Sequence, residues 1–360
     1  MKILHTADIH LREDNIERWN ALSGIVTLAK KERINAMVIS GDLFDADIDA
    51  FRLKARVREL FSDAPFDIIV IPGNHDAKSF EDKAFFGSRV KVLRSVEDTY
   101  EAGNVIISGI PFKNINEQEI FSILHNISGR LSRDKCNILL YHGELLDAYY
   151  SRHDFGDEGD YRYMPVRLDF FKDLKFDYVL AGHFHTNFNA MEFDKLNGIG
   201  YFVIPGSPVS VTKRETGKRK VNIFNTGESP GEVFVDSFYY EAVKIVLDPF
   251  VEDDPVTVIK KTLDKADAQA RILLSIEGYI NSSKHGINET KLHEELELLS
   301  NIKKINEVNF RAIDMSRILE DDVFKAFDAK LKSPAFSSLP FSEKAAMREY
   351  FLRAMMESFV

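Results

Sequence analysis

The sequence has very little cysteine, with one residue, Cys136, among 360. A single thiol forms no internal disulfide and lacks a partner for a cysteine-based zinc site. No apolar run approaches the roughly 20 residues that a membrane-spanning helix needs, and the N-terminus lacks the apolar stretch of a secretory signal. These absences predict a cytoplasmic protein without a membrane partner.

Positive charge is also scarce, because 47 Lys and Arg face 57 Asp and Glu and the formal net charge is −10. That balance does not favour a nucleic-acid binder. Bound divalent cations would nevertheless create a positive cleft in an acidic protein, since metal ions are often the largest local charges. One dense basic run extends from Lys213-Arg214 to Lys220. It suits either a phosphate-binding segment or a solvated hairpin turn around Gly217.

The first part of the chain predicts a layered α/β domain over residues 1–246. Strand-like apolar runs at 2–7, 36–40 and 67–71 alternate with helical apolar spacing at 16–31 and 48–62. This alternation is typical of a domain that begins with a largely parallel sheet. Later apolar runs have less helix between them and predict some antiparallel pairing; they lie at 105–110, 137–141, 178–181, 201–204 and 221–224.

A small second domain is predicted after the acidic segment 247–256, whose two prolines indicate a linker. Residues 256–314 read as helix, strand, helix, strand, which is an αβαβ domain. Residues 317–360 predict a helical tail, and its last helix carries an apolar stripe at every fourth position: Met347, Phe351, Met355 and Phe359. The stripe either packs on the protein's own domain or docks a partner.

Five short polar motifs follow directly on apolar runs. They are Asp8-Ile9-His10, Gly41-Asp42, Gly73-Asn74-His75-Asp76, His142-Gly143 and Gly182-His183-Phe184-His185. Ligands of α/β sheets gather at the carboxyl ends of strands, so these motifs can converge on one site. Each motif alone has an ordinary explanation as a turn or a structural histidine, whereas five in order at strand ends indicate a site.

The residue types in these motifs suit divalent metals. Carboxylate, imidazole and amide oxygen without thiolate favour manganese, iron(II) or zinc over calcium. The i, i+2 spacing of Asp8 and His10, and of His183 and His185, places each pair on one side of an extended segment. Asp42 follows a glycine at a strand end and is the candidate carboxylate between two ions, about 3.5–4 Å apart.

The ordered set resembles the calcineurin-like metallophosphoesterase superfamily, with motifs D-x-H, G-D, G-N-H-D, H and G-H-x-H. The resemblance implies an α/β/β/α sandwich and two divalent ions, with manganese our first choice. It implies that one ion is held by Asp8, His10, Asp42 and His185, and the other by Asp42, Asn74, His142 and His183. His75 would be the catalytic histidine near the scissile phosphate, and Asp76 either orients it or caps the turn. Pro205-Gly206-Ser207 also matches a common family feature.

Within the superfamily, KILHTADIHL, GDLFD and IPGNHD most resemble the SbcD-type DNA-repair exonucleases. That resemblance implies a homodimer that acts on DNA with an SbcC-type coiled-coil ATPase. It also implies that the small domain caps the nuclease and that the helical tail docks the ATPase. One residue departs from the pattern, because these exonucleases commonly carry a histidine where this chain has Asp45.

Three functions remain open from the sequence. The first is a DNA nuclease with an ATPase partner, and the second is a phosphatase or phosphodiesterase for small phosphoesters, which Asp45 and the acidic charge favour. The third is a scaffold subunit that mainly binds DNA or the ATPase. The candidate substrate-binding residues are Asp45, Ser207, Lys213 and Arg214.

Overall fold

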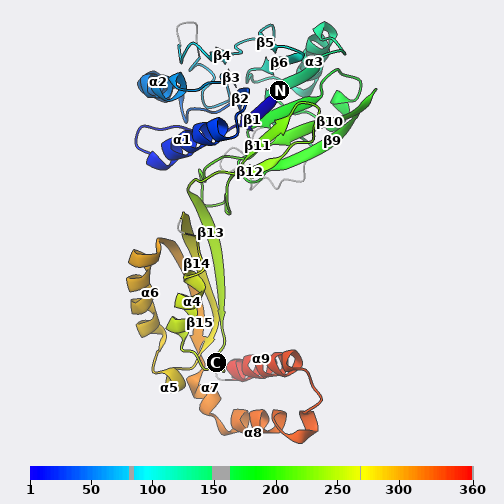
Figure 1. Cartoon of the computed structure of the whole chain (residues 1–360). Helices are drawn as coiled ribbons and strands as arrows, with labels where there is room; N and C mark the ends of the chain where they lie inside the picture. Colours follow the sequence, from blue (N-terminus) through cyan, green and yellow to red (C-terminus); the bar gives the residue numbers. More distant parts are fainter. Residues whose placement is uncertain (81–84, 148–162, 268, 359–360) are drawn as a thin grey trace. The chain divides into compact units, whose positions relative to one another are not determined.

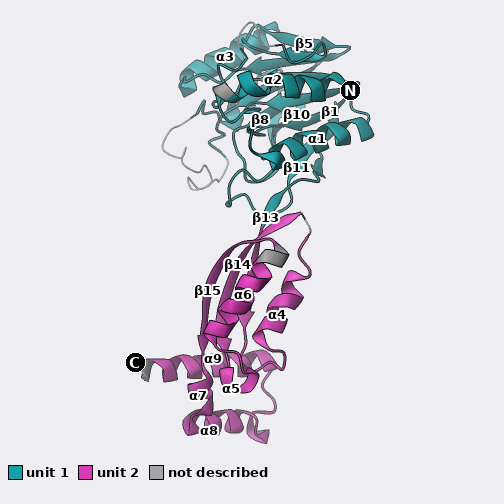
Figure 2. Ribbon diagram, turned by 90° about the vertical axis from the view of Figure 1, so that its left-hand side faces the viewer, with its two compact units in different colours: residues 1–240 teal, residues 241–360 magenta. Residues whose placement is uncertain are grey.

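The computed structural model describes residues 1–80, 85–147, 163–267 and 269–358. They form two compact units, Met1–Tyr240 and Glu241–Val360, coloured separately in Figure 2. None of the described helices is both long and apolar enough to cross a membrane.

The first unit contains two six-stranded sheets (Figure 1). The first sheet has the order β12-β11-β1-β2-β3-β4, formed by Glu232–Phe234, Lys220–Asn225, Lys2–Thr6, Ala36–Ser40, Asp67–Ile71 and Val90–Val92. The second has the order β5-β6-β7-β8-β10-β9, formed by Thr99–Ala102, Val105–Ile110, Cys136–His142, Tyr178–Gly182, Gly198–Ile204 and Asn189–Lys195. The strands from β1 to β4 are parallel, as are β6, β7, β8 and β10, while β5, β9, β11 and β12 pair antiparallel. The predicted mixture of parallel and antiparallel pairing is confirmed.

Successive side chains along each strand point to opposite faces of its sheet, and the cores on these faces produce four layers. Ile3 of β1 lies in a core between the two sheets, together with Ile69 of β3 and Leu140 of β7. The next residue, Leu4, faces the opposite side and packs in a core with α1 (Ile16–Lys31) and α2 (Asp47–Ser62). On the far side of the second sheet, α3 (Glu117–Arg130) packs in a third core. The α/β/β/α sandwich is therefore confirmed.

Two helices of the first unit, α1 and α3, begin at residues that favour a helix start. Asn15 caps α1 by accepting a hydrogen bond from the Arg18 backbone N–H, and Lys30 and Lys31 occupy its last turn. Asn116 and Glu119 form a reciprocal capping box at the start of α3. These caps satisfy backbone N–H groups in the first turns of α1 and α3.

The second unit is built on a three-stranded sheet in the order β13-β14-β15. Its strands are Tyr239–Leu247, Ala270–Ile280 and Ile305–Asp314, and α4 (Pro255–Leu263) and α6 (Glu289–Lys303) share its core. Asp254 caps α4 through the Thr257 N–H, and Pro255 stands at the first helical position. The segment that we expected to be an interdomain linker therefore lies within the second unit, between β13 and α4.

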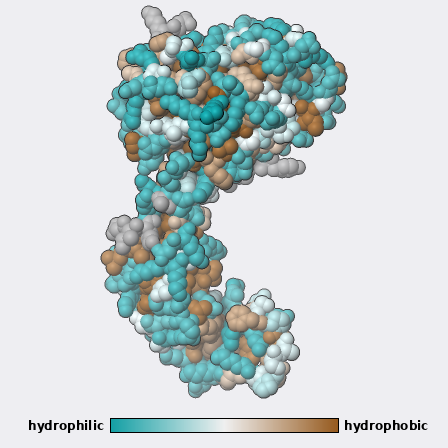
Figure 3. Space-filling model, in the orientation of Figure 1, coloured by the Kyte–Doolittle hydropathy of each residue, from teal (hydrophilic) through white to brown (hydrophobic). Residues whose placement is uncertain are grey.

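The predicted helical tail forms α7 (Ser316–Glu320), α8 (Asp322–Leu331) and α9 (Phe341–Ser358), with α5 (Ser282–His285) before β15. Two rings join α8 and α9, because Phe327 and Phe351 stack with their centroids 4.0 Å apart. Part of the apolar stripe thus packs within the unit, while Phe359 lies outside the described residues. Tyr350 and Phe341 are 73% and 80% exposed, and Figure 3 shows apolar patches on the second unit.

Candidate metal centre

The five motifs meet at one edge of the sandwich. Asp8 and Asp42 follow β1 and β2, Asn74 and His75 follow β3, His142 ends β7, and His183 and His185 follow β8. Within the described residues, three groups of side chains place ligand atoms within 4.8 Å of one another: Asp8, His10 and His185; His10, Asp42 and His75; Asp8, Asp42 and His142. Parallel strands of both sheets thus bring distant residues together at their carboxyl ends.

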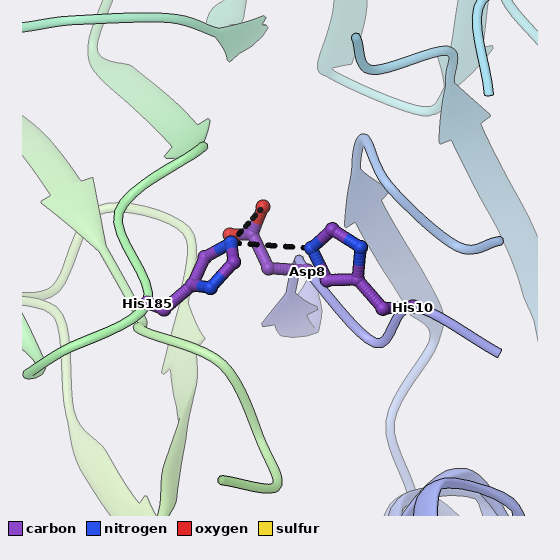
Figure 4. Close-up of side chains that lie close together, drawn as sticks. All are labelled: Asp8, His10 and His185. Atoms are coloured by element: carbon purple, nitrogen blue, oxygen red, sulfur yellow. Dashed lines mark hydrogen bonds and ion pairs between the residues drawn. The ribbon is translucent and has the colours of Figure 1, made fainter. Parts of the chain in front are cut away.

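The first predicted ion site joins β1 to β8. His10 Nε2 and His185 Nε2 lie 3.1 Å apart, and Asp8 Oδ1 lies 3.8 Å from His185 Nε2 (Figure 4). Two imidazole nitrogens bound at about 2.1 Å to one ion at a right angle would lie about 3.0 Å apart. The spacing of the two nitrogens therefore fits a shared divalent ion.

Asp42 lies between the two predicted sites. Its Oδ2 is 3.7 Å from His10 Nε2 and 3.3 Å from His142 Nε2. The His142 nitrogen also lies 2.9 Å from Asn74 Oδ1. A carboxylate in this position can contact ions on both sides, which suits a bridging ligand.

His183 is also brought to the centre. Its backbone N–H donates to both carboxylate oxygens of Asp8 at 3.0 Å. Its ring centroid lies 5.5 Å from that of His142 and 5.0 Å from that of Tyr163. All seven predicted ligands therefore belong to one cluster, although Asn74 and His183 are absent from those three groups.

Backbone strain is concentrated at these residues. Seven non-glycine residues of the described chain have positive φ, and four of them are predicted ligands: Asp8 at 56°, His10 at 52°, Asp42 at 51° and His183 at 92°. Left-handed backbone at a residue with a Cβ costs about 1–2 kcal/mol. Such strain persists where the surrounding structure enforces it, and it clusters at functional sites.

Three of the predicted ligand histidines have their Nδ1 atoms turned toward an acceptor. His142 Nδ1 lies 2.7 Å from the Ser40 carbonyl oxygen, His10 Nδ1 lies 3.4 Å from Asp45 Oδ1, and His185 Nδ1 lies 3.4 Å from Glu215 Oε1. Each arrangement leaves Nε2 directed at the cluster, as metal-ligating histidines require. Glu215 is buried and belongs to none of the five motifs, so it was not predicted from the sequence.

His75 and Asp76 play different structural parts. His75 Nδ1 lies 3.0 Å from the Asp45 carbonyl oxygen, and its ring is 4.7 Å from that of His10. The Asp76 carboxylate accepts from the Gly73 and Phe44 N–H groups, at 2.7 and 3.1 Å. Of the two roles considered for Asp76, these contacts support capping the turn, and a backbone carbonyl orients His75.

Buried charges interact strongly in this cluster. Burial opposes ionisation of Asp42, but the adjacent His142 outweighs it and holds the pKa of Asp42 well below its usual range. Burial likewise opposes protonation of His142, yet Asp42 and Asp8 raise its pKa to about 10. Burial and Asp42 together raise the pKa of Asp76 to about 7. Excess negative charge is thus balanced by protons, which divalent cations could replace.

The four candidate substrate-binding residues differ in their surroundings. The Ser207 side chain is fully buried and donates to the Val209 carbonyl within its own loop. Asp45 accepts from Arg18 Nη1 at 2.7 Å. Lys213 and Arg214 are exposed and immediately precede Glu215. The basic pair therefore lies in a surface segment that adjoins the cluster.

Comparisons with known proteins point in the same direction. Residues 1–187 match the protein family described as calcineurin-like phosphoesterase. The DNA double-strand break repair protein Mre11 of Sulfurisphaera tokodaii is 28% identical over 239 residues, which are 59% of this chain and 55% of that protein. The Mre11 of Aeropyrum pernix is 34% identical over 142 residues, 33% of this chain and 34% of that protein.

The chain spans about half the length, or less, of these curated relatives. A solved purple acid phosphatase from yellow lupin superposes with a TM-score of 0.42 at 13% identity, covering 62% of this chain and 49% of that one.

Proposed function

The chain belongs to the calcineurin-like phosphoesterase family, and from this premise we propose that it is a two-metal phosphodiesterase that cleaves DNA. The observation that carries the proposal is the convergence of the predicted ligands at the carboxyl ends of strands from both sheets. The Mre11 relatives are named as DNA double-strand break repair proteins, which favours DNA as the substrate.

The donor set fits two divalent ions. Asp8, His10, Asp42 and His185 would hold one, and Asp42, Asn74, His142 and His183 would hold the other. Manganese is our first choice, with iron(II) or zinc as alternatives, because the donors are oxygen and imidazole. When bound, the ions would withdraw charge from the phosphodiester and lower the pKa of a water molecule.

His75 is the residue that we assign to proton transfer. Its Nδ1 lies 3.0 Å from the Asp45 carbonyl oxygen, and a carbonyl only accepts, so Nδ1 carries a hydrogen. Nε2 carries a second hydrogen only when the ring is protonated, and as the imidazolium His75 can give that proton to the departing oxygen or use it to stabilise charge on the phosphoryl group. Asp76 supports this role indirectly by fixing the Gly73 turn.

The basic pair Lys213 and Arg214 is proposed to contact the DNA backbone. Both residues are exposed, and the next residue, Glu215, reaches His185 at the cluster. Phosphate contacts of this kind release counterions and make DNA binding weaker as salt increases. Replacing both residues with glutamine should reduce that salt dependence while leaving hydrolysis of a small ester unchanged.

A second candidate is hydrolysis of small phosphodiesters, which Asp45 favours. Where SbcD-type exonucleases commonly carry a histidine, this carboxylate is occupied by Arg18 and faces His10. It therefore offers neither a positive charge nor a proton donor to a polynucleotide. A small ester would need fewer protein contacts than DNA.

The decisive experiment compares manganese-dependent nucleotide release from linear DNA with hydrolysis of a bis-aryl phosphodiester. Wild type and His75→Ala are assayed beside His125→Ala, which removes a histidine from α3 beside Phe121. We expect His75→Ala to lose turnover and retain metal, while the control keeps both. Cleavage of the small ester alone would support the second candidate, and full turnover by His75→Ala would remove His75 from the mechanism.

We extend the proposal to a homodimer that works with an SbcC-type coiled-coil ATPase. Phe51 of α2 is 82% exposed and is a candidate contact between copies. On α9, exposed Phe341 and Tyr350 are candidates for docking the ATPase, with the second unit capping the nuclease. Light scattering of Phe51→Glu tests the first contact, since a wild-type dimer should become a monomer. Co-purification of Tyr350→Glu with a co-expressed ATPase tests the second.

A further inference from the structure

We propose that Asp45 and Glu215 are positioning residues that make one metal site tighter than the other, so that the two ions load in order. The tighter site is the one that contains His10 and His185, here called the first site, and the other, with His142, is the second site. This inference rests on the metal centre proposed above and goes beyond it by assigning two carboxylates that are not ligands.

The Asp45 side chain lies behind His10. Its Oδ1 is 3.4 Å from His10 Nδ1 and 2.7 Å from Arg18 Nη1. The same Arg18 nitrogen donates to the backbone carbonyl of His10. The guanidinium group therefore links the carboxylate to the main chain of the histidine that it faces, and His10 Nε2 is directed at the cluster.

Glu215 repeats this arrangement behind His185. Its Oε1 is 3.4 Å from His185 Nδ1, and its carboxylate accepts from the backbone N–H groups of Val211 at 2.6 Å and Thr212 at 3.1 Å. A buried arginine, Arg219, donates to the carbonyl of His185. Both histidines of the first site thus have a carboxylate at Nδ1 and an arginine on their own carbonyl.

The second site lacks this feature at His142. Its Nδ1 lies 2.7 Å from the Ser40 carbonyl, which is a neutral acceptor on the main chain of β2. A carboxylate at Nδ1 raises the basicity of the imidazole, whereas a carbonyl supplies orientation without a full charge. Loss of such a partner typically reduces metal affinity about 10–100-fold. Two carboxylates at one site therefore favour filling that site first.

The test is a manganese titration of the full chain by equilibrium dialysis, with bound metal measured directly. Wild type should bind two ions in two classes of affinity. Asp45→Asn and Glu215→Gln should each weaken the tight class about 10–100-fold and change the weak class little. The control is Asp67→Asn, which alters a carboxylate bonded to Arg89 and Tyr100 at the amino end of β3. It should leave both classes unchanged.

Each outcome separates the inference from the proposed function. Two ions bound with equal affinity in wild type would overturn ordered loading and leave the phosphodiesterase intact, while no bound manganese, iron(II) or zinc would overturn the metal centre itself. Equal weakening of both classes by either variant would indicate general loss of structure and refute the positioning role. If Glu215→Gln does not fold, Asp45→Asn alone tests the positioning role. The Asp45 side chain is 27% exposed and therefore tolerates the change more readily.

Discussion

Replacing Gly73 with alanine should damage the metal centre through one added methyl group. A Cβ at Gly73 would lie 2.2 Å from Asp42 Oδ1 and 2.5 Å from the Asp42 backbone nitrogen. Ordinary contact begins at 3.4 Å, so the strand-end loop and Asp42 must separate by roughly 1 Å. The Asp42 main chain is fixed on the other side, because its carbonyl accepts from the N–H groups of Ile9 and His10.

The expected magnitude follows from this displacement. Overpacking of a tightly packed site costs about 1–3 kcal/mol. Metal ligands tolerate distance changes of only about 0.2 Å, and Asp42 lies between both predicted ions, so much of the cost should fall on metal binding. We therefore expect manganese affinity to fall on the order of 5- to 150-fold, since about 1.4 kcal/mol corresponds to a factor of ten.

The assay combines manganese titration with thermal unfolding of the metal-free protein. Gly24→Ala is the matched control, because Gly24 lies within α1 and its added Cβ would meet only Asp236 O at 3.5 Å. The control should be stabilised by about 0.5–1 kcal/mol, since alanine is a better helix residue than glycine. Wild-type affinity for both ions in Gly73→Ala would refute the close packing of this loop against Asp42.

Three further predictions test stability. Partial burial of Asp328 opposes its ionisation, but hydrogen bonds from Lys332 and Arg348 outweigh burial and lower its pKa. The ionised carboxylate therefore stabilises the α8–α9 packing at pH values above its unfolded pKa. Asp328→Asn should lower the free energy of unfolding by about 0.5–1 kcal/mol at pH 7. Urea unfolding at lower pH should show this difference disappear as the pH falls through the lowered pKa. Leu292→Ala empties a fully buried position of the second unit and should cost about 2–5 kcal/mol in urea unfolding, with metal affinity unchanged. Chelation should lower the midpoint of thermal unfolding, because an ion at 100 times its dissociation constant stabilises by about 2.7 kcal/mol.

The sequence predicted the strand-end residues well because two short-range rules decide their position. A run such as Ala36–Ser40 has enough apolar character to be buried on both faces, and its end must be followed by a turn. Asp42 then occupies the carboxyl end of a parallel strand whatever the details of packing. The same reasoning located His142 at the end of β7 and Asp8 after β1.

The supporting contacts were not predictable in this way. Glu215 lies in the loop between β10 and β11. Its approach to His185 depends on how residues 205–219 fold back toward the cluster. Ser40 contributes a carbonyl oxygen, which every residue has, so its identity gives no signal. Arg18 lies in an amphipathic helix, where a charged residue ordinarily faces solvent, yet here it is buried against His10.

The division between the two units, at Tyr240 and Glu241, precedes the predicted linker for a similar reason. Residues 247–256 are acidic and contain two prolines, which is typical of a linker. One of them, Pro255, stands at the first position of α4, where its missing N–H costs nothing. The proline that suggested a break therefore begins a helix, and only the pairing of β13 with β14 places the segment in the second unit.

An acidic protein would be expected to repel an anionic substrate, but the local charge of the centre can differ in sign from the net charge. Five carboxyl groups surround it, Asp8, Asp42, Asp45, Asp76 and Glu215, and the arginines that hold its loops are Arg18 and Arg219. With every acid ionised and every histidine neutral, that is an excess of three negative charges, which would repel a phosphodiester. Two divalent cations bring four positive charges and reverse the sign. The attraction for substrate would thus come from the bound ions. The net charge of −10 mainly describes the rest of the surface.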